Sequence, residues 1–139
     1  MILLLINHHI AIMGFVPDVR PAMETAYALA RRATQLDDRN EYARWALGIS
    51  CWGLLKNDES LAALERSVAL NPKCSLAYGS LGTLLGILGR SDDAIANQEI
   101  AIKWAERAIH SMPRWYFAHF VLTASNEAMD QHEQAADAV

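Results

Sequence analysis

The chain has 139 residues and a mass of 15.4 kDa, which is enough to bury a hydrophobic core without disulfides or a structural metal. Ala and Leu are the most frequent residues and far outnumber Val and Thr, so the composition favours helices and excludes an all-β fold. Twelve Lys and Arg against 16 Asp and Glu give a net charge of −4, the wrong sign for a protein whose main partner is a nucleic acid.

The chain begins with a short apolar run, 1–6, followed by Asn7 and two histidines. No basic residue precedes this run, and it is far shorter than the ~20 apolar residues of a membrane span. We therefore expect neither a signal peptide nor a transmembrane helix. Cys51 and Cys74 are far apart in the sequence and form no C-x-x-C motif, which predicts two reduced thiols in a cytoplasmic protein.

The main feature of the sequence is a repeat with a fixed interval, in which equivalent positions differ by 34. Three sets of small residues keep this spacing: Gly14, Gly48 and Gly82; Ala26, Ser60 and Ala94; Ala33, Ser67 and Ala101. Each interval holds an apolar helix, a polar turn and a second helix, which predicts a pair of antiparallel helices. Small residues at matching positions let the two helices approach to the short end of the usual ~8–10 Å between axes.

In chain order the repeat predicts units at residues 7–40, 41–74 and 75–113, and an incomplete unit at 114–139, all within one domain over 1–139. The first unit is the least regular, because Asp38 stands where the second unit has Pro72, and Pro17 and Pro21 crowd its turn. In the last unit we expect an aromatic first helix, followed by a second helix of only a few residues.

The interval becomes longer after position 94, as the pairs Leu81 and Leu122, Pro72 and Pro113, and Ala94 and Ala135 show. The increase is the same in all three pairs and corresponds to two helical turns. We therefore expect an unbroken helix over 91–111, about two turns longer than its counterpart over 60–70. The alternative is a shortened repeat, which a break or kink near Ile102 would indicate.

These residues resemble the tetratricopeptide repeat (TPR) family. The resemblance rests on Leu47-Gly48, Ser60, Ser67 and Leu70-Asn71-Pro72 in the second unit, and on Tyr78, Leu81-Gly82, Gly89-Arg90, Ala94-Ile95 and Ala101 in the third. It implies an all-α fold, a right-handed superhelical array (α-solenoid) of about three and a half antiparallel helix pairs. The chain also resembles the repeat segments that bacterial signalling proteins, such as adenylate cyclases and winged-helix regulators, attach to their effector domains.

In such an array the first helices line the concave face, which predicts an aromatic, nearly uncharged groove for an apolar helix or peptide. The expected contacts are Tyr42, Trp45, Ile49, Trp52, Leu76, Gly79, Thr83, Gly86, Phe117 and Phe120. The positions that hold a Lys/Asn/Arg carboxylate clamp in some TPR proteins carry no such set. The glycines at 79, 82, 86 and 89 share one helix face, where a partner's backbone could approach closely. The alternative is that the aromatic residues are core and the glycines serve packing within the array.

Both ends of the chain carry apolar residues where a repeat array needs a polar cap. Exposed apolar patches of this kind usually mark an interface, so we expect self-association into a homo-oligomer through Ile2, Leu5, Trp115, Phe117 and Phe120. The alternative is that the chain belongs to a longer array.

No motif for catalysis, metal binding or a cofactor is present in the sequence. The five histidines, His8, His9, His110, His119 and His132, lack partners at metal-ligand spacing. The carboxylate pairs recur at turns and helix starts, which indicates capping rather than acid-base chemistry. Cys51 has no basic residue within one turn and is expected to be inert.

The sequence therefore predicts a non-enzymatic protein–protein interaction module or scaffold without cofactors, nucleic acid or membrane as partners. The alternative is a small-molecule-sensing or regulatory domain with a pocket between Trp52, Thr83 and Phe120. A third hypothesis is pure self-assembly.

Overall fold

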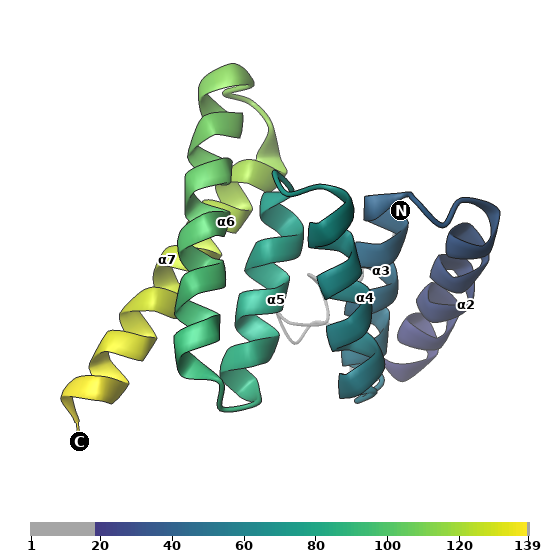
Figure 1. Ribbon diagram of the computed structural model, residues 1–139, viewed down its shortest axis with the longest axis horizontal. Helices are drawn as coiled ribbons and strands as arrows, with labels where there is room; N and C mark the ends of the chain where they lie inside the picture. Colours follow the sequence, from purple (N-terminus) through teal and green to yellow (C-terminus); the bar gives the residue numbers. More distant parts are fainter. Residues whose placement is uncertain (1–18, 139) are drawn as a thin grey trace. The chain divides into compact units, whose positions relative to one another are not determined.

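The computed structural model describes residues 19–138, which form six helices and no strand (Figure 1). The helices are α2 (Arg20–Leu36), α3 (Glu41–Gly53), α4 (Asn57–Leu70), α5 (Ser75–Ile87), α6 (Ser91–Ser111) and α7 (Tyr116–Asp137). The all-α prediction is confirmed. In this part of the chain no helix combines the length and the apolar character needed to cross a membrane.

The chain divides into two compact units, residues 1–70 and 71–139. The first unit contains α2, α3 and α4, and the second contains α5, α6 and α7.

In the first unit, α3 packs against both α2 and α4. Two small residues of α4 tie it to α3, because Ser60 Oγ donates to the Gly48 carbonyl (2.7 Å) and Ser67 Oγ donates to the Glu41 carbonyl (2.8 Å). Leu64 fills the space above Gly48: a Cβ at Gly48 would lie 2.6 Å from Leu64 Cγ. The glycine is thus required by the close approach of these two helices.

In the second unit, α6 packs against both α5 and α7. The pairing repeats that of the first unit, since a Cβ at Gly82 would lie 2.9 Å from Gln98 Cδ and 3.0 Å from the Ala94 carbonyl. Helix α6 has 21 residues against 14 in α4 and is continuous at Ile102. The predicted addition of two turns is therefore present.

The last helix corrects one expectation. Residues 116–137 form a single helix of 22 residues, not a first helix followed by the start of a second. The reason is local, because the sequence from 114 to 139 contains neither Gly nor Pro to end a helix. Ala135, expected in a second helix, lies in the last turn of α7.

The turns after α3 and α5 have the same backbone conformation but different residues. Lys56 N donates to the Cys51 carbonyl and Arg90 N to the Leu85 carbonyl, both at 2.9 Å, the bonds of a Schellman C-cap. The residue before each donor has a positive φ, 61° at Leu55 and 80° at Gly89. Glycine adopts this conformation without strain, whereas leucine does not.

Leu55→Gly is therefore expected to raise the free energy of unfolding by about 1 kcal/mol, because the Leu55 side chain is 77% exposed and loses little packing. Urea unfolding measures the change. The matched variant Gly89→Leu should lower stability by a similar amount, since no atom lies within 4 Å of a Cβ there and only backbone strain is added. A loss of stability in Leu55→Gly would show that the Leu55 side chain makes a stabilising contact.

Candidate functional site

The exposed face of α7 is the most prominent candidate surface. Tyr116, Phe120, Thr123 and Glu127 follow one another at helical spacing and are all exposed; we call them the α7 stripe. The Tyr116 and Phe120 side chains are 60% and 37% exposed, and their rings stack with centroids 6.5 Å apart and planes at 20°. Two large aromatic rings thus lie against each other at the surface.

The α7 stripe corresponds to a face that is covered in the other first helices. Thr123 is the repeat equivalent of Gly82 across the longer interval, and Gly82 is the equivalent of Gly48 across the shorter one. Gly48 is covered by Leu64 of α4, and Gly82 by Gln98 of α6. On α7, in contrast, Thr123 and its neighbours on the stripe are exposed in the described structure.

The opposite face of α7 packs within the second unit. Ala118, Val121 and Ser125 are buried, and a Cβ at Gly79 would lie 3.5 Å from Val121 Cγ1 and 3.4 Å from Ser125 Oγ. This packing holds the helix in place and fixes which face remains open.

Further aromatic residues surround the start of α7. Phe117 makes edge contacts with Trp115 (6.5 Å between centroids) and with Tyr116 (5.7 Å). Of the residues expected to mediate self-association, Trp115, Phe117 and Phe120 therefore gather at one place, with Trp115 and Phe117 half-buried. Ile2 and Leu5 lie outside the described residues.

Burial corrects part of the predicted concave face. Trp45 and Ile49 of α3 and Leu76 of α5 are buried, with 2% to 6% of each residue exposed, so they belong to the core and offer no open surface. Helical spacing identified residues that share a face, but it did not show that the face is covered. Tyr42 and Trp52 of the first unit are half-buried, and Thr83 of the second is exposed.

The glycine face of α5 is also occupied. Gly79 meets α7, Gly82 meets α6, and a Cβ at Gly86 would lie 3.3 Å from the His132 ring of α7. The close approach therefore comes from helices of the same chain and not from a partner. These contacts agree with the alternative given by the sequence, in which the glycines allow close packing within the array.

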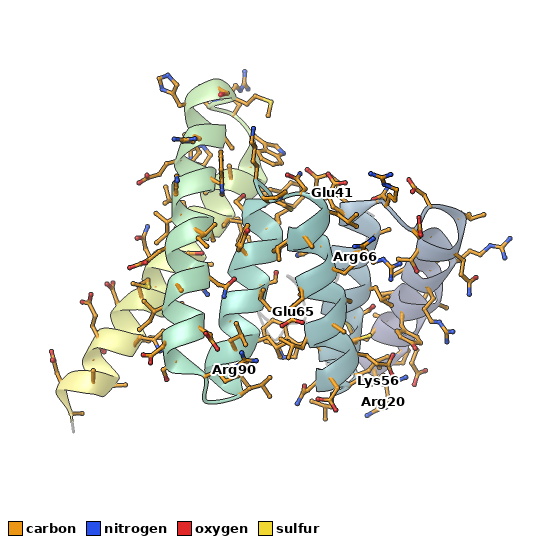
Figure 2. All side chains as sticks on the ribbon, viewed as in Figure 1. Arg20, Glu41, Lys56, Glu65, Arg66 and Arg90 are labelled. Carbon is orange, nitrogen blue, oxygen red and sulfur yellow. The ribbon has the colours of Figure 1, made fainter. Side chains whose placement is uncertain are left out.

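A polar cluster in the first unit joins three elements. Tyr27 Oη donates to Glu59 Oε2 (3.1 Å), the Cys51 thiol lies 3.9 Å from the same oxygen, and Lys56 Nζ, labelled in Figure 2, lies 3.7 Å from Glu59 Oε1. Burial, reinforced by the Glu59 carboxylate, raises the pKa of the Cys51 thiol to about 11. The thiol stays protonated at neutral pH, which is unfavourable for a nucleophile.

Two histidines of the second unit have contacts within the fold. His119 Nε2 lies 2.7 Å from the Pro113 carbonyl, and His132 packs at Gly86. Between residues 19 and 138 no group of three or more His, Cys, Asp or Glu side chains is arranged to hold a metal ion.

No family model and no curated protein matches the sequence. The solved structures that are similar in fold include the following two. "Crystal structure of MamA" matches with a TM-score of 0.55 and 20% identity, over 81% of this chain and 71% of that chain. "MamA MSR-1 C2" matches with a TM-score of 0.51 and 24% identity, over 93% of this chain and 66% of that chain, just under two thirds of its length. These likenesses support a TPR-like array of helices, and neither bears on the resemblance to adenylate cyclases or winged-helix regulators.

Proposed function

We propose that the chain is a non-enzymatic scaffold that acts through protein–protein contacts, and that the α7 stripe is a docking surface. A second copy of the chain supplies the docked element. The observation that carries this proposal is the exposed, stacked pair Tyr116 and Phe120, on the face that α4 and α6 cover on α3 and α5.

Physical arguments support docking at this surface. Aromatic side chains are enriched in the centres of protein interfaces, and fully burying one contributes about 1.5–3 kcal/mol. Two adjacent rings provide a compact anchor at low entropic cost, because each side chain has only two rotatable angles. The likeness to TPR-like structures agrees with an array that presents helix faces to partners.

In the first unit, the half-buried Tyr42 and Trp52 remain proposed contacts for an apolar peptide of a different protein. In the second unit, the exposed Thr83 remains a proposed contact of the same kind. The small-molecule-sensing alternative has no observation in its favour among residues 19–138.

Phe120→Asp is expected to abolish self-association, because it places a charge on the docking surface that must be desolvated when a second copy binds. Sedimentation velocity should give a single species of 15.4 kDa for this variant and larger species for the wild type. The control is Leu29→Asp, which introduces the same charge at another exposed apolar residue, on α2. Association of Phe120→Asp as strong as that of the wild type, with unchanged helicity, would contradict the proposal.

A further inference from the structure

Three basic side chains converge on one indole in the second unit. Arg107 Cζ lies 4.8 Å from the centre of the Trp104 ring, Lys103 Nζ 5.6 Å and Lys73 Nζ 5.7 Å. We call these four residues the Trp104 cluster. Lys103, Trp104 and Arg107 are on α6, whereas Lys73 comes from the turn before α5. Cations within about 6 Å of a ring centre are attracted to its face, so each of the three side chains can make a cation–π interaction with the indole.

The positive charges of the Trp104 cluster are not neutralised by a direct ion pair within the described part of the chain. None of its three cations forms an ion pair there, although Glu99 and Glu106 are on the same helix. Lys103 and Arg107 lie before the last turn of α6, whose basic residue is His110, so the helix dipole does not account for the cluster. Three neighbouring positive charges repel one another, so an added anion is bound favourably.

Carboxylates gather on α7. Asp130, Glu133 and Asp137 are exposed and lie within about 60° of one another around the helix axis; we call them the acidic stripe. Residues 115–139 contain no Lys or Arg. Arg90, in the α5–α6 turn and labelled in Figure 2, forms its ion pair with Asp93 and not with the acidic stripe: its Nη2 lies 2.7 Å from Asp93 Oδ2.

One copy cannot join these two surfaces to each other. His132 of α7 and Ala94 of α6 both approach Gly86, so these two residues lie at the same height along the helices of the second unit. Trp104 lies nearly three helical turns further along α6, about 15 Å from that level, and α7 runs in the opposite direction. Figure 1 shows the end of α7 and the far end of α6 at opposite ends of the second unit. The surfaces can meet only between two copies.

We propose that the acidic stripe of one copy docks on the Trp104 cluster of a second copy. This inference rests on the self-association proposed above and adds a second contact, made by the acidic stripe and not by the α7 stripe. The two surfaces are different, so the contact is head-to-tail and leaves one surface of each kind free to bind a further copy. The match of three carboxylates to three cations favours this occupant over a nucleic acid or an anionic membrane, which the net charge of −4 would repel.

Charge reversal on each side tests the proposal. The first variant is Lys103→Glu with Arg107→Glu, and the second is Asp130→Lys with Glu133→Lys. All four residues are exposed, so both variants should keep the wild-type helicity and unfolding midpoint. Each variant alone should be monomeric by sedimentation velocity at low ionic strength. An equimolar mixture should associate again, because each reversed surface then meets its complement on the other variant.

The outcomes separate this inference from the proposed function. Wild-type association that weakens as sodium chloride is added, is lost in both variants and returns in the mixture supports the inference. Association of either variant like the wild type, or failure of the mixture to associate, overturns it, while loss of association in Phe120→Asp still supports the function. A monomeric wild type overturns both. Binding of RNA or anionic lipid vesicles by a monomeric wild type would assign the Trp104 cluster to that other partner.

Discussion

Leu64→Ala is expected to lower the free energy of unfolding of the first unit by about 3 kcal/mol. Leu64 is fully buried and occupies the space above Gly48, so its truncation leaves a cavity between α3 and α4. Urea unfolding followed by circular dichroism measures the loss. A change below about 1 kcal/mol would show that the two helices are not packed as described.

The same pair provides an internal control. Gly48→Ala alone should also destabilise, because its Cβ would lie 2.6 Å from Leu64 Cγ. In the Leu64→Ala background the clash with Leu64 Cγ is removed and only the tight 3.3 Å contact with the Ser60 carbonyl is left. Alanine is favoured over glycine in a helix by about 1 kcal/mol, which offsets part of this strain. The double variant should therefore be more stable than the sum of the single effects predicts. Strict additivity would contradict the contact.

Gln98→Leu is expected to raise the free energy of unfolding by about 1–2 kcal/mol. Gln98 is 1% exposed, and its Oε1 has no hydrogen-bond partner in the described part of the chain. Its Nε2 donates to the Gly79 carbonyl (3.2 Å) and to Thr83 Oγ1 (3.1 Å), but that carbonyl also accepts from Thr83 Oγ1, so leucine leaves it bonded. Leu64, at the equivalent position of the preceding repeat, lies opposite Gly48 in the same way as Gln98 lies opposite Gly82.

Urea unfolding again measures the effect. The control is Gln134→Leu at an exposed position of α7, which should change stability by less than about 0.5 kcal/mol. A loss of stability in Gln98→Leu would contradict the account and show that Oε1 has a partner, such as a buried water.

The pairing of helices could be predicted from the sequence because it depends on local spacing. Glycines and small residues at the repeat interval mark where two helices approach, and the longer interval after position 94 predicted the length of α6. The continuity of α7 was also predictable, since no Gly or Pro occurs after Pro113. That signal was outweighed by the expectation that every unit contains two helices.

The site could be predicted only in part, because exposure depends on which helix covers which face. Helical spacing predicted that Trp45 and Phe120 both line the concave face, yet Trp45 is buried and Phe120 is exposed. The Trp104 cluster depends on the side chain of Lys73 reaching α6 from another element, which no pattern along one helix reveals.

The central claim is that copies of this chain bind one another through α7. The most direct test is the absolute molar mass of the wild-type protein, measured by light scattering across a range of concentrations at low ionic strength. We predict a mass that rises above 15.4 kDa with concentration. A mass of 15.4 kDa at every concentration would contradict the claim.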